Sequence, residues 1–205
     1  MEFNLLRAGD EKDREQWLGA IERLPSERQD VYFYPEYLQA YEHSADIEAY
    51  CAVYKKDNAI LLYPFLKSVI HLTENVPNTS VLQDIQTPYG YGGPVVNGAG
   101  EDPKFLHEVW SNFADWCLAE GVVSEFVRFH PLIDNVRWVP QLMNTFVDRL
   151  TIPIPLERYP EDLYGTSYYS RHRQMLNKAE RVGFTFDVLP AESELSWFFP
   201  LYQET

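Results

Sequence analysis

The sequence predicts a mixed α/β fold, with one domain spanning residues 1–150 and a second domain beginning at residues 151–205. Segments with helical spacing of apolar residues alternate with short runs rich in Val, Ile, Tyr and Phe. Pro, Gly, Asn and Asp separate these segments, as expected of turns. The 205 residues are enough for one large domain, or for one complete domain and part of another.

The chain is expected to begin with a short strand over residues 3–7, followed by a helix over residues 12–24. The helix is predicted because its apolar residues recur at spacings of three and four. Asp10 or Asp13 is expected to cap it, since an aspartate before the first turn accepts from a free backbone N–H.

Pro35 opens the second predicted helix, because proline is favoured at the first helical position. Tyr37, Leu38 and Tyr41 would form the buried stripe of this helix.

Two strands are predicted next, over residues 47–54 and 59–66, with Asp57-Asn58 as the turn between them. Pro64 lies inside the second run and has no N–H for a strand ladder. It therefore predicts a sheet edge, a strand end or a bulge there.

A run rich in glycine and proline, residues 84–95, then interrupts the regular elements. It reads Asp-Ile-Gln-Thr-Pro-Tyr-Gly-Tyr-Gly-Gly-Pro-Val. Proline and glycine disfavour both a helix and a central strand, so we expect a loop.

The remainder of the first domain is expected to hold a long helix and two strands. The helix would begin at Asp102-Pro103 and end at Gly121. Strands are predicted over residues 122–129 and 144–155, with a short helix from Asp134 between them.

Residues 151–205 are expected to open a second domain that this chain leaves incomplete. The pattern is a helix over residues 160–182, a strand over residues 184–189 and another helix from residue 191. This set of elements buries little apolar surface by itself.

Composition excludes several classes of function. The formal net charge is −14, from 17 Lys and Arg against 31 Asp and Glu, which argues against binding to DNA or to an anionic membrane. No apolar run reaches the length of a membrane span. Cys51 and Cys117 lie far apart in apolar contexts, which favours reduced thiols in a cytoplasmic protein over a disulfide. The five histidines are scattered, so no metal site is predicted.

The glycine-rich loop is the first candidate site. Gly90 and Gly92 allow close approach to the backbone, while Tyr89 and Tyr91 add phenols beside it. One interpretation is a tight connection between two strands. The other is the wall of a binding cleft that holds a polar substrate.

A local basic segment in this acidic protein is the second candidate. Arg171 and Arg173 lie at the predicted start of a helix, where two guanidinium groups and free N–H groups can bind a phosphate or carboxylate. Lys178 shares the side of Arg171. A solvated helix face is the alternative.

Arg128 and His130 form the third candidate, because strand alternation places both on one side at a strand end. His130 is equally interpreted as a structural histidine and Arg128 as an ion-pair partner.

Together these motifs resemble the FemAB-like branch of the GNAT superfamily, including peptidoglycan bridge-forming aminoacyltransferases and BioF2-like acetyltransferases. The resemblance lies in Pro35-Glu36-Tyr37, in Thr-Pro-Tyr-Gly-Tyr-Gly-Gly-Pro at 87–94, in Val-Arg-Phe-His-Pro at 127–131, and in Arg173, Lys178-Ala179 and Gly183. It covers the chain from about Tyr32 to the end.

The resemblance implies two tandem GNAT-like domains and transfer of an acyl or aminoacyl group from a thioester or a charged tRNA to an amine. The acceptor would be a small anionic molecule such as a cell-envelope precursor. No cofactor would be bound tightly, with acyl-CoA or aminoacyl-tRNA as co-substrate. His130 or Asp84 would take the proton of the amine.

Because family members run past residue 205, the chain is expected to be the acceptor-binding half, inactive alone and lacking a C-terminal GNAT partner half. A non-catalytic module for an anionic sugar or peptide is the alternative function. Self-association through exposed apolar surface is the third expectation, since the missing half would leave such surface uncovered.

Overall fold

A computed structural model describes residues 1–71, 81–140, 143–153, 169–190 and 196–204. The chain divides into two compact units, Met1–Asp148 and Arg149–Thr205. The prediction that both are GNAT-like domains, the second incomplete, stays a prediction.

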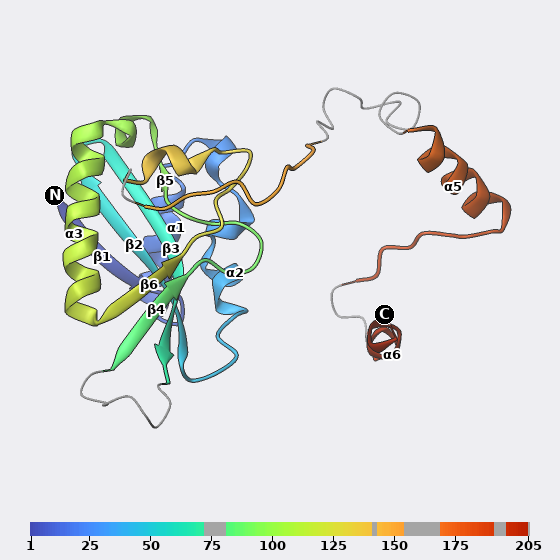
Figure 1. The fold of residues 1–205 in the computed structure, drawn as a ribbon, viewed down its shortest axis with the longest axis horizontal. Helices are drawn as coiled ribbons and strands as arrows, with labels where there is room; N and C mark the ends of the chain where they lie inside the picture. Colours follow the sequence, from blue (N-terminus) through green and yellow to red (C-terminus); the bar gives the residue numbers. More distant parts are fainter. Residues whose placement is uncertain (72–80, 141–142, 154–168, 191–195, 205) are drawn as a thin grey trace. The chain divides into compact units, whose positions relative to one another are not determined.

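The first unit is built on a six-stranded sheet with the order β1-β2-β3-β4-β6, and β5 pairs with β3 beside that path (Figure 1). The β1 to β4 neighbours are antiparallel, whereas β4 and β6 are parallel. The strands are β1 (Glu2–Arg7), β2 (Ile47–Lys56), β3 (Ala59–Ile70), β4 (Leu82–Gln86), β5 (Val95–Val96) and β6 (Val122–Phe126).

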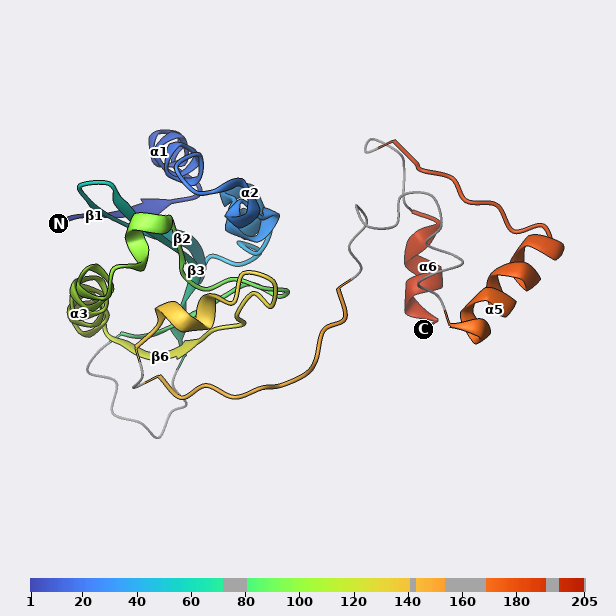
Figure 2. The ribbon, with the colours of Figure 1, turned by 90° about the horizontal axis from the view of Figure 1, so that it is seen from above.

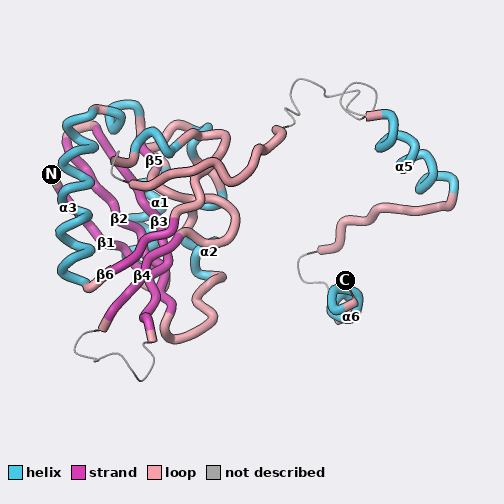
Figure 3. The backbone as a smooth tube through the Cα atoms, in the orientation of Figure 1, coloured by secondary structure: helices cyan, strands magenta, loops and turns pink. Residues whose placement is uncertain are grey.

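Helices cover both faces of this sheet. The α-helices are α1 (Glu11–Ile21), α2 (Pro35–Gln39) and α3 (Pro103–Glu120), and the 3-10 turns are η1 (Ser26–Arg28), η2 (Val31–Phe33), η3 (Gly98–Glu101) and η4 (Asn135–Trp138). Figure 2 shows α1 and α2 on one side of the sheet and α3 on the other. Figure 3 shows the helices around the central strands. The predicted mixed α/β class is therefore confirmed.

The core lies on both faces of β3, whose residues 59–66 are all buried. On the α3 side, Tyr63 and Phe65 pack against Phe113, with ring centroids 5.3 and 6.0 Å away. On the other side, Trp17 of α1 is fully buried and its indole N–H donates to Phe33 O at 2.9 Å. A strand apolar on both faces thus organises the first unit.

The predicted helix caps are confirmed. The Asp10 side chain accepts from the Asp13 N–H at 3.0 Å and begins α1. Asp102 precedes α3, and Gly121 ends that helix at φ 73°. A Cβ at Gly121 would lie 2.8 Å from Val81 O, so glycine is required there for space as well as for conformation.

The loop predicted over residues 84–95 is shorter than expected, since Val95 belongs to β5, and one strand prediction in this unit was wrong. Asp84–Gln86 belongs to β4 and not to the loop, because these residues pair with β3 on one side and with β6 on the other. The predicted strand over residues 144–155 is not formed in its described part, residues 144–153. Its β-branched and aromatic residues are suited to a strand, but no ladder is present among the described residues.

The second unit contains α5 (Ser170–Arg181) and α6 (Phe198–Gln203). Gly183 follows α5 at φ 80°, and the Phe184 N–H donates to Ala179 O at 3.1 Å, closing the helix end. The described residues 184–189 form no strand, contrary to the prediction. Residues 154–168 and 191–195, where parts of two helices were predicted, lie outside the described residues.

Candidate functional site

The glycine-rich loop leaves β4 and runs beside the segment that leaves β6. Because β4 and β6 are parallel, both segments emerge at the same edge of the sheet. The Gly92 N–H donates to Arg128 O at 2.8 Å, and Gly92 forms a parallel bridge with Phe129. The loop is therefore attached to its neighbour along its length rather than free.

Thr87 begins this attachment. Its buried hydroxyl Oγ1 accepts from the Arg128 N–H at 2.9 Å, and its own N–H donates to Phe126 O at 3.0 Å. The Arg128 guanidinium donates to Thr87 O at 3.3 Å and lies 4.6 Å from the centre of the Phe126 ring. Arg128, predicted to bind substrate, thus also holds the loop.

Asn135 completes the attachment, and the sequence analysis did not select it as a site residue. Its side chain is fully buried and donates to Gly92 O at 2.7 Å and to Pro94 O at 3.0 Å. Its Oδ1 accepts from the His130 N–H at 2.8 Å. Asp134-Asn135 indicated only the start of a short helix in the sequence, so only the fold identifies this role.

A cluster of tyrosines forms the outer side of the loop. We call it the tyrosine patch; it comprises Tyr32, Tyr37, Tyr41, Tyr89 and Tyr91. The phenol of Tyr37 donates to Tyr89 O at 2.7 Å, and that of Tyr41 donates to the same oxygen at 3.3 Å. The Tyr32 ring meets the rings of Tyr37 and Tyr91 edge to face, with centroids 5.0 and 5.5 Å away.

The patch also corrects the helix prediction. Of the expected buried stripe on α2, Leu38 is fully buried, whereas Tyr37 and Tyr41 are only half-buried. Their hydroxyls turn toward the loop because buried phenols need hydrogen-bond partners, which the Tyr89 carbonyl provides.

Gly90 fits the patch because it has no side chain. Its φ is +100°, and a Cβ there would lie 2.5 Å from Cε1 of Tyr32. A Cβ at Gly92 would lie 2.8 Å from Cγ2 of Thr87. These two glycines therefore let the backbone lie directly against the aromatic rings and against Thr87.

Burial sets the protonation state of two phenols. The pKa of Tyr32 is raised by desolvation, and the neighbouring Asp30 carboxylate raises it further. The pKa of Tyr37 is also raised, first by desolvation and then by its hydrogen bond to Tyr41. Both phenols are therefore neutral at physiological pH, and the Tyr37 O–H is the donor to Tyr89 O.

His130 is buried beneath the patch, and both of its ring nitrogens are engaged. Nδ1 accepts from the N–H groups of Leu132 and Ile133, each at 3.3 Å, so the ring proton lies on Nε2. Nε2 faces Asp30 Oδ2 at 3.4 Å. Desolvation lowers the pKa of His130, and Asp30 opposes that shift. These contacts support the structural interpretation, and a catalytic role stays a prediction.

The other predicted site residues lie elsewhere. Asp84 is in β4, opposite Ser68 and Ser124, and its carboxylate makes no hydrogen bond or ion pair within the described residues. Arg171 and Arg173 lie in the first turn of α5 and Lys178 in its last turns, all in the second unit. A site shared by these cations and the loop stays a prediction.

Comparisons with known proteins give only remote similarity. No family model matches the chain, and no curated protein matches it. Among solved structures, it is similar to a ribosomal-protein-alanine N-acetyltransferase from Brucella melitensis biovar Abortus 2308, with a TM-score of 0.38 and 13% identity over 73% of this chain and 100% of that one.

Two further solved structures are similar to a comparable degree. One is an aminoglycoside acetyltransferase from an uncultured soil metagenomic sample, in complex with sisomicin, with a TM-score of 0.38 and 13% identity over 75% of this chain and 96% of that one. The other is a tetramutant of the BH1408 protein from Bacillus halodurans, with a TM-score of 0.38 and 11% identity over 76% of this chain and 100% of that one.

Proposed function

We propose that this chain is an N-acyltransferase of the GNAT type whose first unit binds the acceptor. The observation that carries the proposal is the tyrosine patch on a loop held in one conformation by Thr87, Arg128 and Asn135. Such a rigid surface with phenol donors can position a polar acceptor, and positioning contributes much of the catalysis in a two-substrate transfer.

The chemistry requires little from the protein beyond placement. A neutral amine attacks the thioester or ester carbonyl of the donor, the acyl group moves to nitrogen, and the thiol or tRNA hydroxyl leaves. The amine proton passes to Asp84 or to water, or to His130 once its Nδ1 is released from the N–H groups of Leu132 and Ile133. The phenols of Tyr32, Tyr89 and Tyr91 donate hydrogen bonds to hydroxyl, carboxylate or phosphate oxygens of the acceptor, while those of Tyr37 and Tyr41 hold Tyr89 O.

The finer assignment follows the resemblance in the sequence. We place the protein near the FemAB-like and BioF2-like branch, with a small anionic, cell-envelope type of acceptor. Arg171, Arg173 and Lys178 of α5 would supply the cations for that acceptor. Acyl-CoA or an aminoacyl-tRNA would be the donor, and a C-terminal GNAT half would complete the donor site.

A direct test is to titrate the chain with glucosamine 6-phosphate, which carries both an amine and a phosphate, and with acetyl-CoA. Binding is measured by calorimetry, and transfer by release of the coenzyme A thiol. Tyr91→Phe removes one phenol of the patch. The matched control Tyr50→Phe removes a phenol that donates to Glu48 at 2.7 Å, on β2.

We expect glucosamine 6-phosphate to bind the wild-type chain and Tyr91→Phe to weaken that binding about threefold to tenfold, the value of one lost hydrogen bond. Tyr50→Phe should leave binding unchanged. Equal affinities in all three proteins, or no binding to the wild type, would contradict the proposal.

A non-catalytic module that binds an anionic sugar or peptide is the second candidate. It is favoured by the engagement of both ring nitrogens of His130, since neither is free to take a proton. The measurement is repeated after a C-terminal GNAT half is added to the chain. If the acceptor binds but no coenzyme A thiol is released in either case, the non-catalytic module is favoured over the enzyme.

A further inference from the structure

A hollow of about 600 Å³ lies between the first half of α3 and the residues that follow η4. It is lined by side chains from both segments, among them Glu101, Leu106, His107, Trp110, Arg137 and Trp138. None of these residues belongs to the tyrosine patch, so the hollow is separate from the site described above.

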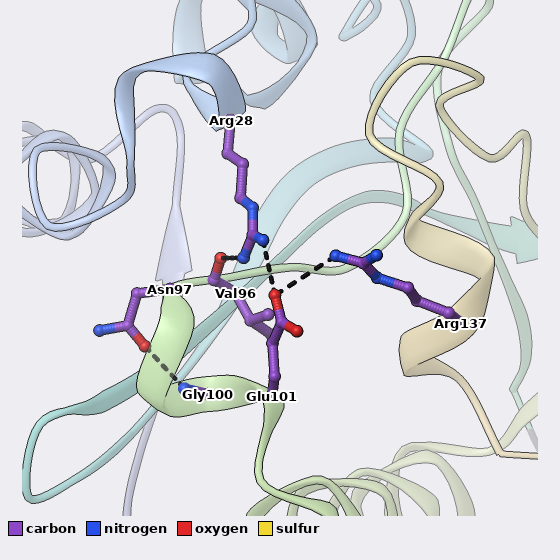
Figure 4. Close-up of polar contacts among 6 residues, drawn as sticks. All are labelled: Arg28, Val96, Asn97, Gly100, Glu101 and Arg137. Carbon is purple, nitrogen blue, oxygen red and sulfur yellow. Dashed lines mark hydrogen bonds and ion pairs between the residues drawn. The ribbon is translucent and has the colours of Figure 1, made fainter.

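One wall of the hollow carries an ion pair between Arg137 and Glu101. Glu101 Oε1 accepts from Arg28 at 2.6 Å and from Arg137 at 3.3 Å (Figure 4). Arg28 also donates to Val96 O at 2.7 Å, which fixes its position. Two guanidinium groups therefore share one carboxylate, and of the two arginines Arg137 lines the hollow.

Arg137 has hydrogen-bond donors that its contact with Glu101 does not use. Its side chain is 48% exposed, against 15% for Arg28, and its one side-chain hydrogen bond among the described residues is the 3.3 Å contact with Glu101. A guanidinium carries five N–H donors in a planar arrangement, so Arg137 has a free edge for a second carboxylate.

The floor of the hollow is aromatic and contains a polar atom without a partner. Both guanidinium groups lie over the Trp138 ring, with Cζ 4.8 and 5.0 Å from its centre. The ring is 3% exposed, and its Nε1–H has no acceptor within the described residues. Trp110 is different, since its Nε1–H donates to Trp138 O at 2.6 Å.

A buried N–H without an acceptor is unfavourable, and it makes the Trp138 indole a sensitive reporter beside the hollow. The remaining walls are apolar, with Leu106 and Trp110 from α3. A small carboxylic acid with a flat apolar body fits these residues. Its carboxylate would bind Arg137, and its apolar body would lie against Leu106 and Trp110.

We propose that this hollow binds a small carboxylic acid with a flat apolar body. The proposal does not depend on the acyltransferase function, because it uses neither the tyrosine patch nor α5. The occupant is recognised by charge at Arg137 and by apolar contact with Leu106 and Trp110.

The test uses phenylacetate as the probe and the full chain labelled with ¹⁵N. The indole N–H signals of Trp110 and Trp138 are assigned with Trp→Phe variants and followed during the titration. Phenylacetamide, a neutral analogue of the same shape, is titrated in parallel. Coenzyme A is added in a third titration to test whether a donor occupies the hollow instead.

We expect phenylacetate to shift the Trp138 signal with a Kd of about 1 mM or tighter, and phenylacetamide to bind at least about tenfold more weakly. Arg137→Gln should weaken phenylacetate binding about tenfold, whereas Arg14→Gln, on the other side of the sheet, should not. Glu101→Gln should strengthen it, because the competing carboxylate is removed.

Equal affinity for phenylacetate and phenylacetamide, no shift of either indole signal, or a response to coenzyme A alone would overturn the proposal. The comparison of the two probes uses only the wild-type protein. This comparison therefore remains a valid test even if a variant fails to fold. Circular dichroism of each variant shows whether it is folded.

Discussion

At the scale of single residues, Asn135 connects more of the candidate site than any predicted residue. Three hydrogen bonds of one buried side chain join the loop backbone at Gly92 and Pro94 to the segment at His130. The sequence indicated this residue only as the start of a short helix, because its partners are 5 to 43 positions away along the chain.

Asn135→Ala is expected to lower the free energy of unfolding by about 2–5 kcal/mol, because buried backbone groups lose their partners at about 1–3 kcal/mol each. Urea denaturation measures the change. Asn112→Ala is the matched control, since the Asn112 amide is exposed and donates only to Glu108 O within α3. A loss below about 1 kcal/mol for Asn135→Ala would contradict the role of this side chain.

His130 predicts a pH dependence of stability. Burial lowers its pKa in the folded protein. As the pH falls below about 6.5, the unfolded chain therefore binds a proton that the folded protein does not bind, and the free energy of unfolding decreases. Above that pH, the ring is neutral in both states and this contribution is constant.

His130→Gln should remove this part of the pH dependence between pH 7.5 and 5.5, measured as the difference between urea denaturation curves of the variant and the wild type. The exposed His43→Gln is the control and should retain the wild-type slope. An identical slope in His130→Gln and wild type would show that the buried imidazole does not contribute.

At the scale of elements, Pro64 shows how a sequence rule and the fold are reconciled. β3 is a central strand, although proline favours an edge. On one side β3 pairs with β5 at Leu61 and Leu62, and with β4 only from Leu66 onward. Pro64 lies in the break between these two ladders, so its missing N–H costs no ladder hydrogen bond there.

The ends of α3 could be predicted because capping depends on neighbouring residues only. The Asp102 side chain accepts from the Lys104 N–H at 3.3 Å. Asp102→Ala should therefore lower the free energy of unfolding by about 0.5–2 kcal/mol. Asp115→Ala, in the exposed interior of the same helix, is the control and should have no such cost. Thermal denaturation of both variants measures the difference, and equal effects would exclude a capping role.

At the scale of the whole molecule, the hydrophobic core belongs to the first unit. Its buried members lie between Leu6 and Trp138, while α5 and α6 of the second unit have no buried residues. Burial of apolar side chains is the main stabilising contribution in folding. The free energy of unfolding should therefore reside mainly in residues 1–148.

A chain of residues 1–148 is expected to unfold cooperatively, because it keeps every core residue. Its free energy of unfolding by urea should agree with that of the full chain within about 0.5 kcal/mol. Urea denaturation is followed by circular dichroism, in the far ultraviolet for the backbone and in the near ultraviolet for the aromatic side chains. A non-cooperative transition, or a large decrease in the midpoint, would show that the second unit contributes to the core.

No helix among the described residues combines the length and apolar character needed to cross a bilayer.

Cys51 and Cys117 are free thiols, and burial raises the pKa of both, to about 12 for Cys117. Their thiols are therefore protonated at neutral pH and unreactive as nucleophiles.

The sequence by itself determined the mixed α/β class, the helix caps at Asp10 and Asp102, and the loop over residues 87–94. These features depend on local propensities, on helical periodicity and on the conformations of proline and glycine, all of which act between near neighbours. The tertiary structure decided that β4 is a parallel partner of β6, that Pro64 lies in a break of the ladder, and that Asn135 and the tyrosine patch hold one loop. These features depend on contacts between residues far apart in the chain, whose pairing is set by the packing of the whole sheet.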